Sequence, residues 1–454
     1  MADPFIKRHE VKFIAVCMGL FAMAAGWFLS TRPGHRIEGD FLEREQAAQV
    51  DEWLVAQLQN TIAEQRARAC LAIGRIGGSD AVGRLAPLVA DHAPSVRATV
   101  AFALGIVEDQ ALRGGREPDP EAAKALLSLL DDDERRVVMN AVDSLGRMAW
   151  SDAAPSIIET PAPLPVTLAA LVRMDDRTQV PWMIDQLRSP DQDARWAAAM
   201  ALGALAFEPD AETVPLLTNL QRDRNNFVRA AAAHALRYAK PTDLTLGALE
   251  SFASDLDPKI QFEAFESLVH LGIGGADEAL LELTGHADSL PPRNPGPSGP
   301  VPDFEPVLAP DELQVVARTV GRHLRLETTS GAFDIELDYE HAPLTSERFY
   351  RLATDRGFDG ASFGRVRPNG YAQARAKAAG AFRSELNPQP FLRGSLGLVS
   401  AEANLDAPEF FIALTPLPLA DGRYTNFGRL LSGDELLDKI TPSTRILSIK
   451  TAID

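Results

Sequence analysis

Residues 323–339 read HLRLETTSGAFDIELDY, and apolar side chains alternate with polar ones along this stretch. A period of two is typical of β-strands with one buried face, and the glycine in the middle indicates the turn of a hairpin. The inward-facing residues are expected to be Leu324, Leu326, Phe333, Ile335 and Leu337. The C-terminal part of the chain is therefore predicted to be an antiparallel β-structure.

Six blocks of sequence follow one another through this part of the chain. They are DIELDYEHAPLTSERF (334–349), FDGASFGRVRPN (358–369), ELNPQPF (385–391), RGSLGLV (393–399), EFFIAL (409–414) and DGRYTNFGRLLSGDELLDKI (421–440). In these blocks and their order, residues 312–454 resemble the cyclophilins, most closely the compact bacterial ones. The resemblance implies a small antiparallel β-barrel and peptidyl-prolyl cis-trans isomerase activity on proline-containing polypeptides.

The same resemblance implies a set of site residues. Arg365 stands at the position of the catalytic arginine of cyclophilins, and Gln373 at the position of their active-site glutamine. Phe411 corresponds to the floor of the proline pocket. The other residues expected to bind substrate are Tyr371, Glu409, Leu419 and Tyr424. Neither a metal nor a cofactor is expected, because isomerisation needs only a twisted amide to be stabilised.

Several positions depart from the family pattern. Gly370 stands where a pocket phenylalanine is usual, Glu409 replaces a glutamine, and Leu419 replaces a tryptophan or its bacterial substitute. Ser400 and Ala401 occupy an Asn-Ala stretch. Two hypotheses therefore stay open. A working isomerase is preferred, and the alternative is a degenerate cyclophilin-like domain that binds proline-containing segments or acts as a scaffold.

Residues 41–285 repeat one helical pattern, seen in RARACLAIGRIG (66–77), VRATVAFALGIV (96–107), ARWAAAMALGAL (194–205) and VRAAAAHALRYA (228–239). The spacing lies near the ~30–45 residues of helical-repeat proteins, and each unit ends in residues that cap or stop a helix. The pattern resembles short HEAT-like repeats and predicts an α-solenoid of about seven units. The unit around residues 160–174 contains several prolines, so a kink or break is expected there.

The solenoid is expected to bind a protein partner on its concave face rather than to catalyse a reaction. His234 and His270 are interpreted as packing residues because no second ligand completes a metal site at helical spacing. Cys70 is interpreted as a core residue, and no disulfide is expected from the two cysteines of the chain. Almost all of the excess negative charge precedes residue 312, which argues against a nucleic-acid partner.

Residues 286–311 include SLPPRNPGPSGPVPDFEPVLAP (289–310) and are predicted to be a Pro-rich linker that holds the two folded parts apart. At the other end, a basic flank (1–12) precedes the uncharged run FIAVCMGLFAMAAGWFLS (13–30). This run predicts a transmembrane helix, either as an uncleaved anchor, which is preferred, or as a signal segment cleaved after residue 24.

The predicted architecture is thus multidomain. An N-terminal transmembrane helix precedes an α-solenoid of HEAT-like repeats and a C-terminal antiparallel β-barrel of cyclophilin type. Because positive flanks stay in the cytoplasm, the protein is expected to be anchored in a bacterial inner membrane with both domains facing the periplasm. The barrel would then act on exported proteins.

Overall fold

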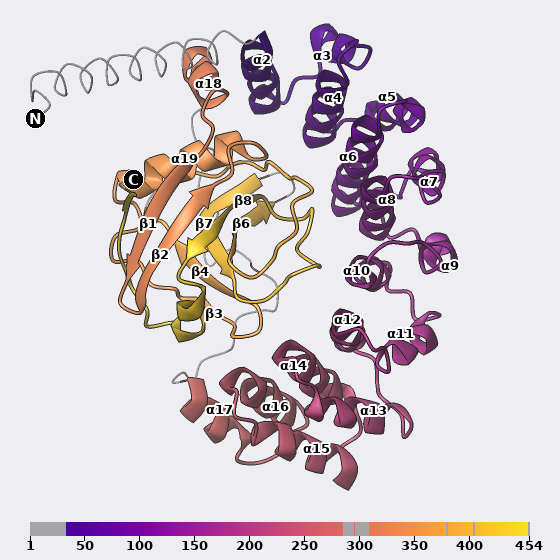
Figure 1. Cartoon of the computed structure of the whole chain (residues 1–454), viewed down its shortest axis with the longest axis vertical. Coiled ribbons are helices and arrows are strands. Elements are labelled where there is room, and N and C mark those ends of the chain that lie inside the picture. Colours follow the sequence, from indigo (N-terminus) through magenta and orange to yellow (C-terminus); the bar gives the residue numbers. More distant parts are fainter. Residues whose placement is uncertain (1–32, 285–294, 296–307, 378–379, 403–404, 453–454) are drawn as a thin grey trace, which may run out of the picture.

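The computed structural model describes residues 33–284, 295, 308–377, 380–402 and 405–452. In it, a curved stack of helices bends around a curled antiparallel sheet (Figure 1). The stack contains, in chain order, α2 (Pro33–Ala47), α3 (Glu52–Gln57), α4 (Ala63–Ile76), α5 (Ala81–Leu85), α6 (Pro94–Arg113), α7 (Pro120–Leu127), α8 (Arg135–Arg147), α9 (Ala154–Ile157), α10 (Leu164–Met174), α11 (Val180–Gln186), α12 (Gln192–Ala204), α13 (Thr213–Asn219), α14 (Asn226–Ala235), α15 (Asp243–Ala253), α16 (Pro258–His270) and α17 (Ala276–Thr284). We call α3–α17 the array.

The even-numbered helices from α4 to α16 form the inner row of the array, next to the sheet, and each packs on the next (Figure 1). Small residues make this close packing feasible. A Cβ atom on Gly74 would lie 2.8 Å from the Cβ atom of Ala103, and one on Gly146 would lie 2.5 Å from the Cα atom of Ala170. These separations are too short for a side chain, so Gly and Ala recur at these positions because neighbouring helices touch there.

A ladder of ion pairs explains the basic residue at the start of many units. Arg66 donates to both oxygens of Asp91 at 2.7 Å, and Arg97 donates to Asp132 at 2.6 and 2.9 Å. Arg195 and Arg229 repeat the arrangement with an aspartate 28 and 26 residues further on. Each bond links the inner helix of one unit to the end of the next helical segment, so the repeat pattern in the sequence records contacts between successive segments.

The fourth unit was predicted to kink or break the stack, and the structure shows no break there. Its outer helix, α9, is only four residues long, and prolines precede α10. However, α10 packs against both α8 and α12, and its Leu168 and Leu171 are fully buried. The stack is therefore continuous through this unit, because the prolines lie before or in the first turn of α10, where they are tolerated.

The C-terminal part forms one curled sheet with the strand order β3-β4-β7-β6-β8-β2-β1-β9, and β5 pairs with β7. A short helix, α18 (Pro310–Val316), precedes it, and α19 (Pro343–Thr354) covers one opening. The strands are β1 (Arg322–Thr328), β2 (Gly331–Leu337), β3 (Arg365–Val366), β4 (Tyr371–Arg375), β5 (Phe382–Arg383), β6 (Ser395–Glu402), β7 (Leu405–Ala413), β8 (Asn426–Ser432) and β9 (Ile446–Thr451). The five residues expected on the inward face of the first hairpin are all buried. We call this part the barrel.

The first half of the array contacts the barrel through buried arginines that donate to backbone carbonyls. Arg75 at the end of α4 donates to the carbonyl of Leu386 at 3.0 Å and to that of His341 at 2.7 Å. Leu386 itself packs against Phe102 and Ile106 of α6. Further along, Arg173 of α10 donates to two carbonyls in the barrel loop 415–421. These bonds fasten two barrel loops to the inner row.

The last inner helix, α16, contacts the β3–β4 hairpin of the barrel. Arg367 donates to both carboxylate oxygens of Glu266 at 2.6 and 2.8 Å, and both side chains are largely buried. The side-chain amide of Asn369 donates to the carbonyl of Lys259 at 2.8 Å. The array therefore encloses the barrel from α4 to α16, and its inner face is occupied by a domain of the same chain.

This arrangement corrects one expectation. The array and the barrel were expected to be held apart, but they share a buried interface that charge pairs and hydrogen bonds stabilise. The predicted transmembrane helix, residues 13–30, lies outside the described residues. Within the part of the chain that the structure describes, no helix is both long enough and apolar enough to cross a bilayer.

Candidate active site

Three neighbouring strands bring the predicted catalytic residues together. In the register of the sheet, Arg365 of β3 is opposite Gln373 of β4, and Gln373 is opposite Phe411 of β7. Arg365 is half-buried, whereas the other two are almost fully buried. Partners directly opposite one another have Cβ atoms about 5 Å apart. Residues that lie up to 46 positions apart in the sequence thus form one row across the sheet.

The polar side of this row is held by Glu409. The side-chain amide of Gln373 donates to one carboxylate oxygen of Glu409 at 2.5 Å, and Arg375 lies 3.0 Å from the other oxygen. Glu409 is 1% exposed, so its charge is compensated within the protein rather than by solvent. Glu409 was expected to contact substrate, and in the structure its carboxylate accepts the hydrogen bond from the Gln373 amide.

The apolar side of the row is a cluster of aromatic rings around Phe411. The centroid of its ring lies 5.3 Å from that of Phe391, 5.6 Å from that of Tyr424 and 6.1 Å from that of Tyr371. Phe411 and Tyr371 are 0% exposed. Gly397 leaves room for this cluster, because a Cβ atom there would lie 2.3 Å from the Phe411 ring.

Burial also changes the acidity of the cluster. It raises the pKa of Tyr371 to about 12, although the nearby Arg365 and Arg367 lower it. The hydroxyl therefore stays protonated at neutral pH and keeps its capacity to donate a hydrogen bond. The second tyrosine, Tyr424, donates through its hydroxyl to the backbone carbonyl of Pro295 at 2.9 Å.

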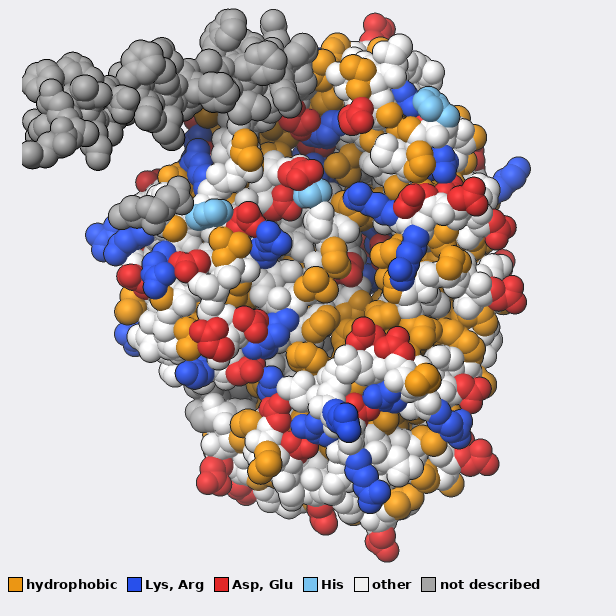
Figure 2. Space-filling model, viewed as in Figure 1, with side chains coloured by type: hydrophobic (Ala, Val, Ile, Leu, Met, Phe, Trp, Pro, Cys, Tyr) orange, Lys and Arg blue, Asp and Glu red, His pale blue; other side chains and the backbone are white. Residues whose placement is uncertain are grey.

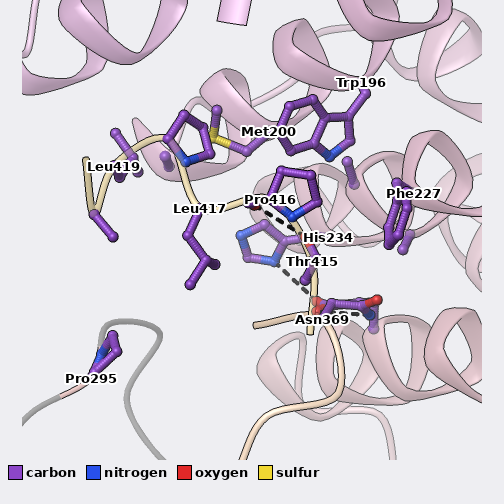
Figure 3. Close-up of a pocket in the computed structure, with 16 residues that line it drawn as sticks. Trp196, Met200, Phe227, His234, Pro295, Asn369, Thr415, Pro416, Leu417 and Leu419 are labelled. Atoms are coloured by element: carbon purple, nitrogen blue, oxygen red, sulfur yellow. Dashed lines mark hydrogen bonds and ion pairs between the residues drawn. The ribbon is translucent and has the colours of Figure 1, made fainter. Parts of the chain in front are cut away.

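A cavity of about 130 Å³ lies beside this cluster, between the array and the barrel loop 415–420. Trp196 and Met200 of α12 and Phe227 of α14 form its array side, and Leu417 and Leu419 belong to its barrel side (Figure 3). Figure 2 shows hydrophobic side chains gathered along the boundary between the barrel and the middle of the array. The predicted substrate-binding residue Leu419 lines this cavity, so it faces the array.

Sequence reasoning missed two apolar residues that pack around Phe411. Phe391 and Leu417 pack around Phe411, but each lies in a loop, where no periodicity distinguishes a buried apolar residue from an exposed one. The only feature of the sequence that pointed to Phe391 was its place in ELNPQPF (385–391), one of the six blocks that resemble cyclophilins. At Gly370, where a pocket phenylalanine is usual in the family, Arg367 packs closely, and its Cβ atom would lie 3.3 Å from a Cβ atom on Gly370. The side chains of Ser400 and Ala401 lie outside those described.

A group of ionisable residues borders the cavity. Atoms of His234, Glu263 and Glu266 that could ligate a metal lie within 4.8 Å of one another, a grouping that spacing along a single helix did not predict because α14 and α16 contribute separately. Two guanidinium groups approach Glu266, with Arg367 at 2.6 Å and Arg237 at 3.6 Å. This positive charge already compensates the carboxylate, so the group favours an ion-pair network over a cation site.

Comparisons with known proteins show which families the two parts of the chain resemble. A profile of the family described as "Cyclophilin type peptidyl-prolyl cis-trans isomerase/CLD" matches residues 323–449, and a profile of HEAT repeats matches residues 52–146 and 166–237. Over 127 residues, the chain is 35% identical to "Peptidyl-prolyl cis-trans isomerase-like 1" of Rhizopus delemar, covering 25% of this chain and 77% of the relative. Over 138 residues, it is 31% identical to a peptidyl-prolyl cis-trans isomerase of Synechococcus elongatus, covering 28% of this chain and 95% of the relative.

A solved cyclophilin-type isomerase of Cryptosporidium parvum aligns with 30% of this chain and 99% of its own length, at 22% identity and a TM-score of 0.28. The barrel is therefore a cyclophilin-type domain, and helical repeats enclose it. The chain belongs to the cyclophilin-type peptidyl-prolyl cis-trans isomerases and carries HEAT repeats before its isomerase domain.

The predicted location is corrected. A bacterial inner-membrane protein with its domains in the periplasm was expected, but no membrane-spanning helix is found among the described residues. Relatives from Rhizopus delemar, Schizosaccharomyces pombe and Neurospora crassa are eukaryotic cyclophilin-like proteins, not bacterial periplasmic ones. The apolar run on which the expectation rested, residues 13–30, lies outside the described residues.

Proposed function

We propose that the barrel isomerises X–Pro bonds in polypeptides with Arg365 as the catalytic residue. The observation that carries this proposal is the row Arg365, Gln373 and Phe411 on three adjacent strands. This row combines a permanent cation, an amide and an apolar ring. A prolyl substrate presents the matching features, namely a tertiary amide beside a saturated ring.

Isomerisation requires rotation about a bond that resonance keeps planar, against a barrier of ~18–20 kcal/mol. When the bond twists, the nitrogen lone pair becomes localised and the nitrogen becomes a hydrogen-bond acceptor. A donor aimed at that nitrogen stabilises the twisted state more than the planar one, which lowers the barrier. Arg365 is suited to this role because a guanidinium stays charged and presents its donors in a rigid fork.

The remaining residues take supporting roles in this proposal. Gln373 donates to or accepts from the substrate backbone, and Glu409 fixes its orientation through the 2.5 Å bond. Phe411, with Tyr371 and Tyr424, forms the apolar surface that receives the prolyl ring. The array holds the β3–β4 hairpin, which carries Arg365 and Gln373, through Arg367 and Asn369. Its protein-binding role thus includes its own catalytic domain.

A second candidate function is a binder of proline-containing segments that turns over slowly. The observation that favours it is the complete burial of Phe411 beneath Phe391, Tyr371 and Tyr424. A prolyl ring reaches Phe411 only after these rings move. If these rings rarely move apart, the apparent affinity for the peptide and the rate of isomerisation are both lowered, because only the fraction of molecules with an open cluster accepts substrate.

The test is peptide isomerisation by the full chain, measured by NMR exchange spectroscopy on a peptide containing one proline. Arg365→Ala is expected to lower the rate by roughly 30- to 1000-fold, since a transition-state donor is worth ~2–4 kcal/mol. Arg365→Lys is expected to rescue little, because a point charge does not reproduce the planar fork. Arg445→Ala, at an exposed position of the same barrel, serves as the matched control.

The outcomes separate the two candidates. Retained activity in Arg365→Ala would show that the assigned arginine is wrong. A parent chain that binds the peptide but does not accelerate exchange would favour the slow binder.

A further inference from the structure

We propose that the cavity between the array and the barrel loop 415–420 is a subsite for an apolar side chain flanking the substrate proline. The subsite would make the array part of the specificity machinery of the isomerase. This inference rests on the proposed function, because it takes the polypeptide bound by the barrel as its ligand.

The array side of the cavity is built from apolar residues on one face of two adjacent inner helices. Trp196 and Met200 are four residues apart on α12, and Phe227 and Ala231 are four residues apart on α14. This spacing puts each pair on the same helical face. All four are half-buried, although most apolar residues of the inner helices are fully buried. They form an apolar wall that the barrel does not fill.

The barrel side of the cavity is a loop that the array holds in position. Arg173 of α10 donates to the carbonyl of Pro418 at 2.7 Å and to that of Asp421 at 3.0 Å. Between these two anchors the loop presents Leu419 and Ala420 to the cavity. Because hydrogen bonds hold the loop on both sides of these two residues, the cavity is favoured to be a preformed site rather than an incidental gap.

The size of the cavity selects a single side chain. Its volume is about 130 Å³, close to the ~150 Å³ of an apolar cavity that binds benzene. A leucine or phenylalanine side chain therefore fits, whereas a folded domain or an extended lipid chain does not. The polar groups at its edge are engaged with one another. His234 lies 3.5 Å from Glu263, and Asn369 donates to the carbonyl of Lys259.

The cavity is continuous with the aromatic cluster of the candidate active site. Leu417 and Ala420 line the cavity and also pack in the cluster around Phe411. Pro295 lines the same cavity (Figure 3). Its carbonyl accepts the hydrogen bond from the Tyr424 hydroxyl. One polypeptide carbonyl is thus already bound where the cluster meets the cavity. This contact favours a peptide as the occupant.

The test compares isomerisation of peptides that differ only in the residue beside proline, with alanine, leucine or phenylalanine on either side. The full chain is expected to prefer the larger residue on one side by about tenfold in kcat/KM. Ala231→Leu, which fills the cavity, is expected to abolish this preference.

Two further variants make the outcome decisive. Met200→Ala enlarges the cavity and is expected to shift the preference from leucine towards phenylalanine. Ala56→Leu, at an exposed position of α3 outside the cavity, is expected to change nothing. If the full chain shows no preference for the larger residue on either side, or if Ala231→Leu and Met200→Ala both leave its preference unchanged, the subsite is refuted while the proposed isomerase stands. Absence of turnover with every peptide, the alanine peptide included, would refute the proposed function and the subsite with it.

Discussion

Replacing Glu266 by glutamine is expected to release the β3–β4 hairpin from the array. Arg367 has 3% and Glu266 10% of its side chain exposed, and their closest atoms are 2.6 Å apart. Removing one partner of such a buried pair costs about 3–5 kcal/mol, because the other charge stays buried without compensation. Burial alone would lower the pKa of Arg367, but the neighbouring Glu263 and Glu266 raise it.

Glu263 remains in the variant and offsets part of the loss, so the lower end of the range applies. A cost of about 3 kcal/mol corresponds to roughly a 100-fold increase in the open population. Hydrogen exchange measured by mass spectrometry detects this directly, as faster deuterium uptake in residues 365–375. Uptake in α4 is expected to stay as in the parent, because its contact with the barrel runs through Arg75.

Two controls accompany this experiment. Asp438→Asn breaks the pair between Lys259 and Asp438, whose carboxylate is 43% exposed, and is expected to cost below about 1 kcal/mol. The double variant Glu266→Leu with Arg367→Met replaces the pair by apolar groups and is expected to restore protection close to that of the parent. If Glu266→Gln changes uptake in residues 365–375 by less than about threefold, the ion pair does not hold the hairpin and the argument fails.

Two further predictions concern stability. Burial raises the pKa of Asp406 to about 7, above the ~3.9 of an exposed carboxyl, so its contribution is complete below about pH 4 and is lost as pH rises through 7. Asp406→Asn should flatten the decline in unfolding free energy between about pH 4 and 7, and an unchanged profile would contradict this assignment. Gly146→Ala should cost about 1–3 kcal/mol, because its Cβ would meet Ala170 at 2.5 Å. Gly83→Ala, with no atom within 4 Å, is the control and should not destabilise in denaturant titration.

The elements of the fold were predictable where they follow a period. Alternation over residues 323–339 gave the inward residues of the first hairpin, and all five are buried. The recurring arginine and aspartate of the helical units form the ladder seen in Arg66–Asp91 and Arg97–Asp132. Such contacts recur with the repeat, so they leave a regular trace in the sequence.

The contact between the array and the barrel was not predictable in the same way. Arg75 donates to the carbonyl of Leu386, which lies 311 residues further along the chain. Every residue has a backbone carbonyl, so the pattern of side chains does not show which carbonyl accepts such a hydrogen bond. Phe391 and Leu417 lie in loops, and the burial of a loop residue depends on the path of the loop, which no sequence period reveals. Arg365, Gln373 and Phe411 lie instead on strands, within or next to sequence blocks that could be aligned with the family.

The enclosure of the barrel also constrains how this chain can evolve. Repeat arrays commonly gain and lose units, because each unit contacts only its neighbours. Here, the unit with Arg75 and the unit with Glu266 both hold the same barrel. If a unit between them were duplicated or deleted, Arg75 and Glu266 could no longer both reach their partners in the barrel, and one of the two contacts would be lost. The width of the barrel therefore sets the number of repeat units between Arg75 and Glu266. A change in the number of units would require a matching change in the barrel loops.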